Sequence, residues 1–345
     1  MADFRIANLV VGDEHPPLVV VELGINHGGD LQIAIKMAKD ALDAGATVIK
    51  HQTHIPDAEM SQEARLVKPG NSEKSIYEVI SENTLSEEEE YELMRYVHSR
   101  GGLFFSTPFS KEAFYRLKEW DVPAYKIGSG ECNNYPLVDL IAQDGKPIIL
   151  STGMNSIASI AVSVSILKER KVPFALLHTT NLYPTPQHLI RLAGINDLRN
   201  NFPGTVVGLS DHSTSNAACV AAVAHGARIL ERHFTDSKDR RGPDIPCSMD
   251  PSDLKQLIRD SKDAFLAEGG GRFPANEESV TIRFAFASVV STKEILPGET
   301  LNEENIWVKR PYGGDFGPAD YKNLIGKVAA KKIQSNAQLR KSDLA

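Results

Sequence analysis

The sequence is poor in cysteine and has no long hydrophobic run. Its three thiols, Cys132, Cys219 and Cys247, are scattered and show no CxxC spacing. An odd, scattered set of thiols argues against a disulfide framework or a zinc knuckle and favours a reducing cytoplasm. No apolar stretch approaches the roughly 18 residues that a membrane helix needs, and no basic region followed by an apolar run begins the chain. We therefore expect a cytoplasmic protein with no membrane partner.

An excess of positive charge is also lacking. The chain has 38 Lys and Arg against 45 Asp and Glu, a formal net charge of −7. This balance argues against a nucleic-acid partner or an anionic membrane surface. Hydrophobic content of 41% and charged content of 24% are ordinary for a globular protein, and 345 residues suffice for one large and one small domain. Any anionic substrate must be held by a local basic pocket.

Short β-prone runs alternate with amphipathic helical patterns through most of the chain. Gly45 is placed to end the first helix, and Ser86 with Glu89 forms a capping box for a later one. Eight strand–helix pairs within roughly 250 residues predict a (β/α)8 TIM barrel over residues 1–270. An open doubly wound sheet is the alternative. The predicted strands are 18–23, 47–51, 103–106, 124–127, 147–150, 174–178, 206–209 and 228–231.

The pattern changes after the glycines at 269–271. Residues 271–283 are polar and are interpreted as a linker. Residues 284–345 form a different, smaller domain with β-prone pieces at 287–290, 306–309 and 329–333. About 60 residues are marginal for independent stability, so we expect this domain to pack against something, such as another subunit.

Two histidines occupy matching positions at the ends of neighbouring predicted strands. His212 and His233 each follow a short β-prone run, and the segment between them suits a helix. Adjacent parallel strands lie about 4.8 Å apart, so both imidazoles can reach one ligand. A lone strand-end His is more often a hydrogen-bonded structural residue. This pair is accompanied by Asp211, Glu231 and Arg232, which are costly near a core, so the pattern favours a metal site.

Polar side chains follow every predicted strand of the barrel. Two lysines, several hydroxyls and glycine-flanked backbone amides describe a phosphate-sized anion site, because ammonium and N–H donors offset a desolvated charge. We therefore expect a cationic pocket in an acidic chain. The strand-end side chains are Glu22, Asn26, His27, Lys50, Gln52, Ser106, Thr107, Lys126, Ser129, Glu131, Ser151, Thr152, His178, Asn181, Tyr183, Ser210, His212, Glu231 and His233.

Several of these features have a simpler interpretation. A single strand-end lysine is usually a solvated surface residue. Ser151, Thr152 and Ser210 can equally be helix N-caps. The GSGE segment at 128–131 lacks the third glycine of a dinucleotide-binding turn, so it indicates turn geometry. Cys247 has no matched base and is interpreted as a small packed residue.

A series of longer motifs closely resembles the sialic acid synthase family of the bacterial N-acetylneuraminate type. The resemblance covers nearly the whole chain, in the same order, and such a series is far more specific than any one motif. The motifs are ELGINH (22–27), KHQTH (50–54), STPF (106–109), YKIGSGECNNYPL (125–137), ILSTGM (149–154), NLYPTP (181–186), GLSDHS (208–213), ERHFT (231–235) and WVKRP (307–311).

The resemblance implies a reaction and a set of partners. The reaction is condensation of phosphoenolpyruvate with N-acetylmannosamine and water to give N-acetylneuraminate and phosphate. It also implies a TIM barrel followed by an antifreeze-like (SAF) domain, and a domain-swapped homodimer in which the small domain covers the partner's site. His212 and His233 would hold a divalent ion, Mn²⁺ in the family.

The resemblance also assigns the remaining site residues. Glu22 would sit beside the reacting carbons. The chemistry of the reaction adds the hypothesis that Glu22 is the general acid/base and that Lys50 and Lys126 neutralise the charge on the departing phosphate. Glu131 is expected among the substrate-binding residues. Gln52, Tyr183 and Asp244 would meet the sugar, joined by Arg310 from the other subunit. The phosphoenolpyruvate site would be lined by Lys50, Thr107, Lys126, Ser129, Ser151, Asn181 and Ser210.

Two alternatives stay open from sequence. Close relatives of the family use other amino sugars to make legionaminic or pseudaminic acids and would share the anion and metal sites. A non-catalytic carbohydrate- or ice-binding protein that keeps the barrel as a scaffold is the alternative of another class, although such a protein needs none of the matched metal and phosphate residues.

Overall fold

A computed structural model describes residues 3–70 and 72–345 of the chain. The chain divides into two compact units, Met1–Gly269 and Gly270–Ala345. Each unit has its own apolar core. The larger unit carries the candidate site.

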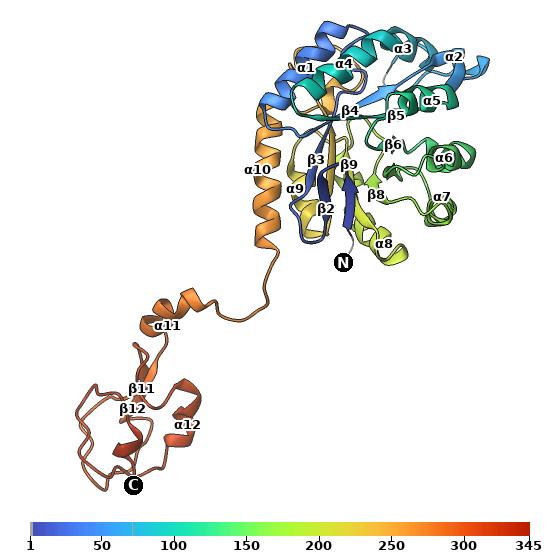
Figure 1. The fold of residues 1–345 in the computed structure, drawn as a ribbon. Coiled ribbons are helices and arrows are strands. Elements are labelled where there is room, and N and C mark those ends of the chain that lie inside the picture. Colours follow the sequence, from blue (N-terminus) through green and yellow to red (C-terminus); the bar gives the residue numbers. More distant parts are fainter. Residues whose placement is uncertain (1–2, 71) are drawn as a thin grey trace. The chain divides into compact units, whose positions relative to one another are not determined.

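The larger unit is a closed barrel of parallel strands in the order β10-β3-β4-β5-β6-β7-β8-β9 (Figure 1). The predicted TIM barrel is therefore confirmed, and the open doubly wound sheet is excluded. The strands are β3 (Leu18–Glu22), β4 (Val48–Thr53), β5 (Leu103–Pro108), β6 (Tyr125–Ile127), β7 (Ile148–Ser151), β8 (Phe174–Thr179), β9 (Val206–Asp211) and β10 (Ile229–His233).

One α-helix of the outer ring follows each barrel strand in sequence. The helices are amphipathic or small-residue segments whose buried residues cover the outside of the strands. Local capping sets their starts: Ser86 and Glu89 form the expected capping box, and Asp250 with Asp253 forms another. The helices are α1 (Leu31–Asp43), α4 (Glu87–Ser99), α5 (Lys111–Glu119), α6 (Tyr135–Ala142), α7 (Ile157–Glu169), α8 (Ala193–Asn201), α9 (Ala217–Ala224) and α10 (Pro251–Ala267).

Alternate residues of each strand point into the barrel. The inner residues nearest the strand starts, among them Val20, Val48, Phe105 and Ile149, form one apolar cluster, separate from the cluster between strands and helices. An N-terminal hairpin of β1 (Asp3–Ile6) and β2 (Leu9–Gly12) adds apolar side chains to this inner cluster and lies at one end of the barrel unit (Figure 1). The hairpin was not predicted. It closes the end of the barrel at the strand starts, opposite the carboxyl ends of the strands.

The polar insertion after β4 is partly helical. It contains α2 (Pro56–Glu59), a 3-10 turn at Gln62–Arg65 and α3 (Ile76–Glu82), which starts at a capping box of Ser75 and Glu78. The sequence indicated only a polar insertion here, because segments this short carry little periodicity.

The smaller unit has a compact core of its own. Its regular elements are α11 (Ser279–Ala285), the antiparallel pair β11 (Ser288–Ser291) and β12 (Ile306–Lys309), and α12 (Tyr321–Leu324). Two details differ from expectation. The predicted linker 271–283 includes the start of α11, and the β-prone segment 329–333 makes only isolated bridges instead of a strand. Bridges at both ends of that segment reach different partners, so no ladder forms.

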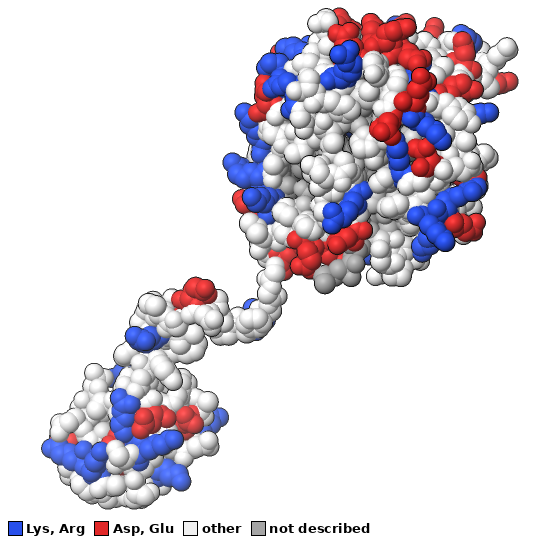
Figure 2. All heavy atoms as spheres, in the orientation of Figure 1, with Lys and Arg blue, Asp and Glu red and all other residues white. Residues whose placement is uncertain are grey.

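No helix among the described residues is long and apolar enough to cross a membrane. On the face of the barrel unit seen in Figure 2, Lys and Arg side chains are interspersed with Asp and Glu. Lys50 and Lys126, which are 4% and 2% exposed, contribute almost nothing to that surface. The charges that matter for the site are inside the barrel.

Candidate active site

Strand register brings the polar inner residues together at the carboxyl ends of the strands. Glu22 is paired with Lys50 on one side and with His233 on the other, and Gln52 is paired with Thr107. In parallel strands, paired residues point to the same side, so these side chains form one layer above the apolar core of the lumen. The inward polar residues on the strands are Glu22, Lys50, Gln52, Thr107, Lys126, Ser151, Thr179, Ser210, Glu231 and His233.

Two lysines and two glutamates form the centre of this layer. Lys50 Nζ donates to Glu22 Oε2 and lies 3.9 Å from Glu231 Oε1, while Lys126 Nζ lies 3.5 Å from the same Glu231 oxygen. Lys126 also donates to the hydroxyl of Ser151 at 2.6 Å, and Ser210 donates to Glu231 at 3.0 Å. All of these groups are buried, so their charges are held by one another and by hydroxyls instead of by water.

Burial and pairing together shift the pKa values of the two lysines in opposite directions. Burial opposes the charge of Lys50, but the nearby carboxylates of Glu22 and Glu231 outweigh it and raise the Lys50 pKa. For Lys126, burial dominates and lowers the pKa despite Glu231. Burial would raise the pKa of Glu231, yet Lys126 and Lys50 together lower it to about 2. Glu231 is therefore ionised at neutral pH.

The expectation of a cationic pocket is wrong in one respect. The two ammonium groups are matched by the carboxylates of Glu22 and Glu231. Glu231 was expected among the strand-end side chains of the pocket, but no catalytic or binding role was assigned to it. The two-residue period of β10 could have indicated this role, because it points Glu231 inward together with His233.

A second group of side chains converges on Gly153, just after β7. The Gly153 amide donates to Ser129 Oγ at 3.0 Å. A Cβ atom at Gly153 would lie 1.9 Å from Asn181 Oδ1 and 2.9 Å from Ser129 Oγ, so only glycine fits. This close approach brings loops after β6, β7 and β8 together beside Lys126 and Ser151.

Several buried oxygens of this region have no hydrogen-bond partner among the described residues. They are Glu22 Oε1, Thr107 Oγ1, Asn181 Oδ1 and Glu231 Oε2. Buried polar atoms are nearly always satisfied in folded proteins. Their concentration at the strand ends, beside two lysines, identifies a binding site for a polar ligand.

His212 and His233 lie side by side, as their matched positions predicted. Their ring centroids are 5.4 Å apart, and the Tyr183 ring packs 4.1 Å from His212 and 5.9 Å from His233. Thr180 O lies 2.9 Å from His212 Nδ1 and can only accept, so Nδ1 carries the proton and Nε2 keeps its lone pair. Burial, with the neighbouring His233, lowers the His212 pKa to about 3, which keeps the ring neutral.

These residues fit a divalent metal ion. His233 Nδ1 is buried and has no hydrogen-bond partner among the described residues, and Asp244 Oδ2 lies 3.5 Å from it. Metal–imidazole bonds are about 2.1 Å long, so one nitrogen of each ring can reach a shared ion. No group of three or more His, Cys, Asp or Glu side chains within residues 3–70 and 72–345 is arranged to hold a metal. A site with two histidines leaves coordination positions open, which suits a catalytic ion better than a structural one.

The side chains assigned to the sugar lie at or just after the carboxyl ends of the strands. Gln52 ends the inner face of β4, Asp244 precedes a 3-10 turn after β10, and Tyr183 lies in the loop after β8. Glu131 begins a 3-10 turn after β6, and burial raises the pKa of its carboxyl to about 7. Arg310 follows β12 in the smaller unit, where it is exposed, so its approach to a partner's sugar stays a prediction.

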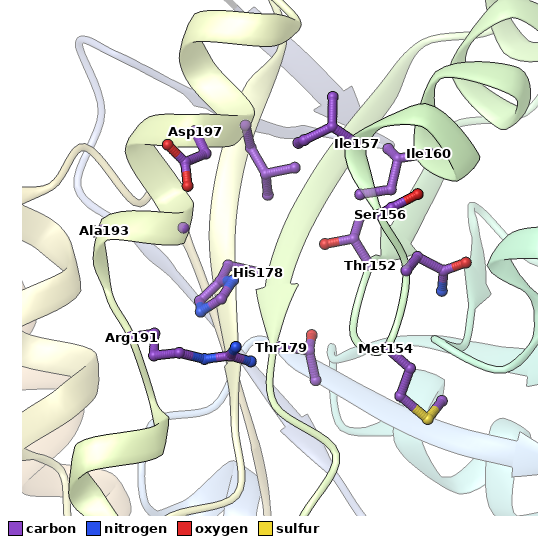
Figure 3. A pocket seen from close by; sticks show the side chains of 13 residues that line it. Thr152, Met154, Ser156, Ile157, Ile160, His178, Thr179, Arg191, Ala193 and Asp197 are labelled. Atoms are coloured by element: carbon purple, nitrogen blue, oxygen red, sulfur yellow. The ribbon is translucent and has the colours of Figure 1, made fainter.

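Two residues expected among the pocket walls point away from the lumen. Ser106 accepts a hydrogen bond from Thr53 at 2.7 Å on the outer face of the strands. His178 donates to the carbonyl of Ile190 at 2.7 Å and lines a separate cleft of about 460 Å³ with Arg191 and Met154 (Figure 3). Each of them is one residue away from an inward-pointing residue of its own strand. Successive side chains of a strand point to opposite faces, so both point outward.

The simpler interpretations of other residues can now be judged. Ser151 and Ser210 are not N-caps, because Ser156 caps α7 and Asn216 occupies the N-cap position of α9. The glycine-rich segment at 128–131 forms the turn that places Ser129 next to Gly153. Cys247 is buried and its thiol lies 3.2 Å from the carbonyl of Asp244, as expected of a packed residue.

Comparison with known proteins agrees with this geometry. The NeuB family model matches residues 37–273, and the SAF domain model matches residues 286–345. The pseudaminic acid synthase of Campylobacter jejuni is 36% identical over 330 residues, covering 94% of this chain and 96% of that protein. The N-acetylneuraminate-9-phosphate synthase of Homo sapiens is 32% identical and covers 94% and 92% of the two chains.

A solved structure is similar as well. The N-acetylneuraminic acid (sialic acid) synthetase of Leptospira borgpetersenii, crystallised with citrate, superposes with a TM-score of 0.74 at 30% identity. The match covers 81% of this chain and 95% of that one. The closed barrel, the inward polar layer and these similarities together show that the chain belongs to the NeuB family of sialic-acid-type synthases and carries a SAF domain at its C-terminus.

Proposed function

We propose that the protein is an N-acetylneuraminate synthase, which condenses phosphoenolpyruvate with N-acetylmannosamine and water and releases phosphate. The observation that carries the proposal is the buried layer in which Lys50 and Lys126 adjoin several unpaired oxygens, next to the His212–His233 pair. The buried lysine layer suits an anionic three-carbon substrate, and the histidine pair suits the aldehyde of a polyhydroxylated sugar. The family supports the coarser statement, a synthase of sialic-acid-type sugars.

In this proposal the lysines bind and stabilise the phosphate. Lys126 is held by Ser151, and Ser129 and Asn181 stand beside it at Gly153. As the enol carbon forms its bond to the aldehyde, positive character develops at the neighbouring carbon, and water adds there. The C–O bond to phosphate then breaks, and the electron pair leaves with the phosphate. Preorganised ammonium groups stabilise the charge that accumulates on the phosphate oxygens.

Glu22 is the proposed general acid/base. One carboxylate oxygen is held by Lys50, while Oε1 is buried without a partner among the described residues. Oε1 is therefore available to take a proton from the attacking water and to return it to the alkoxide oxygen of the former aldehyde. Glu22→Gln keeps the shape of the side chain, so near-normal turnover of that variant would contradict this role.

His212 and His233 would hold the divalent ion, with Mn²⁺ as the expected metal. When bound, such an ion polarises a carbonyl oxygen as a Lewis acid. The Tyr183 ring packs against His212 at a tilted angle and meets His233 edge to face, which holds both imidazoles in place. The hydrogen bond from His212 to Thr180 sets which nitrogen of that ring is free for the metal.

A second candidate substrate is a diacetamido sugar. The 36% identity to a pseudaminic acid synthase is the observation that favours it. The motifs at 50–54, 131–137 and 181–186 favour N-acetylmannosamine, because they resemble the sialic acid branch of the family. Assaying 2,4-diacetamido-2,4,6-trideoxymannose beside N-acetylmannosamine separates the two, and a strong preference for the former would replace the first candidate.

The test of the proposed reaction is phosphate release from phosphoenolpyruvate. We expect release that requires the sugar, stops after chelation and returns with Mn²⁺. No release with either sugar, from folded protein with Mn²⁺ present, would overturn the synthase assignment. Calorimetric titration of phosphoenolpyruvate then tests the remaining alternative, because a pure carbohydrate- or ice-binding protein would give no heat.

We further infer a homodimer in which Arg310 of one subunit serves the sugar site of the other. The exposed position of Arg310 after β12 is compatible with that role. Mixing two inactive variants, Lys50→Met and Arg310→Ala, should restore partial activity, since a mixed dimer has one site with both residues intact. Failure of the mixture to exceed the separate variants, with subunit exchange demonstrated by mass, would contradict the shared site.

A further inference from the structure

A buried histidine stands between the polar insertion and the mouth of the barrel. His54 follows β4 and is 5% exposed. Its Nδ1 lies 3.0 Å from both carboxylate oxygens of Glu59, the last residue of α2, and its Nε2 lies 3.0 Å from Gln52 Oε1. The ring stacks on Phe109 with centroids 4.2 Å apart and planes at 13°. The ring is therefore fixed on both edges and on one face.

The partners of His54 determine where its protons are. The Glu59 carboxylate can only accept, so Nδ1 must donate to it. The amide oxygen of Gln52 can also only accept, so Nε2 must donate as well. His54 is thus placed to donate from both edges of its ring, to Glu59 on one side and to Gln52 on the other.

This arrangement decides which group Gln52 presents to a ligand. Gln52 lies on the inner face of β4, in register with Thr107 and one inward position beyond Lys50. Its oxygen is taken by His54, and no hydrogen bond of its Nε2 is formed within the described parts of the chain. Gln52 therefore has its oxygen held by His54 and keeps two N–H donors for a ligand at the strand ends.

We propose that Glu59 and His54 are positioning residues that orient Gln52 to donate to an oxygen of the open-chain amino sugar. The inference rests on the proposed function and deepens it, because it assigns part of the sugar recognition to the insertion after β4. Gln52 is assigned to the sugar, whereas the proposed phosphoenolpyruvate contacts include Lys126 and the groups around Gly153, so the dyad should affect mainly the sugar. Without the dyad, the Gln52 amide is free to turn and to present its oxygen to an oxygen of the sugar.

The first test compares the two Michaelis constants. Glu59→Gln keeps the size of the side chain but removes the carboxylate that holds His54 Nδ1, so Gln52 loses its fixed orientation. We expect the KM for N-acetylmannosamine to rise about tenfold, while the KM for phosphoenolpyruvate and kcat stay within about twofold. His54→Phe keeps the stack on Phe109, removes both hydrogen bonds and should give the same split.

Glu63→Gln is the matched control, because Glu63 lies in the same insertion and its side chain contacts Ser61. It should leave both constants unchanged. An unchanged sugar KM in Glu59→Gln, or equal increases in both constants, would overturn the positioning role. The second result would indicate general damage to the site.

The second test does not depend on turnover. The ¹⁵N NMR spectrum of histidine-labelled protein, with His54 assigned through His54→Phe, should show both His54 nitrogens protonated at pH 7, and one of them unprotonated in Glu59→Gln. A neutral His54 in the wild-type protein would reverse the direction of Gln52 and overturn the inference. Lack of turnover by wild-type protein with any N-acetylated amino sugar would overturn the proposed function instead, and would leave the NMR result standing.

Discussion

The two halves of the barrel lumen share the same strands but have opposite chemistry. Near the strand starts, Val20 and Val48 are fully buried in an apolar cluster. One inward position later on the same strands come Glu22 and Lys50, which are equally buried but charged. The half of the lumen near the strand starts, called the lower half below, stabilises the fold by removing apolar surface from water. The upper half places charges out of water, which costs free energy unless each charge has a partner.

The difference teaches how this fold separates stability from function. The change from apolar to polar occurs within two residues of each strand, and the backbone geometry does not change. A substitution in the lower half should therefore alter the free energy of unfolding but not the reaction. One in the upper half should alter the reaction, and it should also alter the free energy of unfolding where it leaves a buried charge without its partner. Each of the following changes tests that division.

The largest effect is expected for Lys50→Met in the upper half. The change removes an ammonium group from the phosphate site and leaves Glu22 buried without its partner. We expect kcat/KM to fall about a thousandfold and the free energy of unfolding to fall by about 3–5 kcal/mol. The double variant Glu22→Gln, Lys50→Met removes both charges and should recover most of the stability but none of the activity. Recovered activity would place the proposed chemistry elsewhere.

Phe105→Ala in the lower half should give a similar loss of stability without the loss of activity. Phe105 is fully buried in the inner cluster, so its truncation leaves a cavity that costs about 3–5 kcal/mol of unfolding free energy. Chemical denaturation measures this loss. We expect kcat per folded molecule to stay within about twofold of the parent. Ile149→Val, in the same cluster, should show a loss of only about 1 kcal/mol. A selective loss of kcat in either variant would break the division between the halves.

Glu131 gives the site a pH dependence. Burial raises the pKa of its carboxyl from an ordinary 4.5 to about 7, so the folded protein disfavours the charged form. The contribution of Glu131 to stability is therefore greatest below pH 4.5 and falls as pH rises toward 7. Between pH 5 and pH 8 the free energy of unfolding of the wild-type protein should fall by about 2–3 kcal/mol more than that of Glu131→Gln.

Denaturation at the two pH values checks the Glu131 prediction. Equal pH slopes of wild type and Glu131→Gln would contradict it. In the same comparison, the KM for phosphoenolpyruvate should rise above pH 7 only in the wild type, because the newly charged carboxylate repels the substrate anion.

The smallest effect is expected for His178→Gln. His178 is at the height of the site but on the outer face of β8, where it donates to the carbonyl of Ile190. Loss of one hydrogen bond should cost about 1 kcal/mol of unfolding free energy, with both KM values and kcat unchanged. A marked kinetic defect would mean that the cleft around Arg191 takes part in the reaction.

Much of the barrel was accessible from sequence, because its elements are set by local signals. Strand runs, amphipathic helices and caps such as Ser86 and Asp250 act over a few residues. The N-terminal hairpin was missed because its stability comes from Phe4 and Ile6 packing against the lumen, a contact with strands far along the chain. The segment 329–333 has strand propensity but no ladder partner, so tertiary pairing overrode it.

The sequence indicated which residues gather at the candidate site, but not how their charges are paired. Strand-end position and family resemblance pointed to Lys50, Lys126 and the two histidines. The pairing of both lysines with Glu22 and Glu231 required the strand register, which brings residues up to 211 positions apart, Glu22 and His233, into one layer. For the same reason, sequence reasoning placed Ser106 and His178 in the lumen, although the alternation of the strand turns them outward.

The sequence by itself determined the kind of fold, the family and the set of polar residues at the strand ends, because these depend on local periodicity and on motifs read in order. Only the tertiary structure decided which of those residues face one another, which charges cancel and how His54 and Glu59 orient Gln52. The reason is that closing the barrel fixes the register of distant strands, and a charge inside a protein acquires its protonation and its role from the groups that surround it.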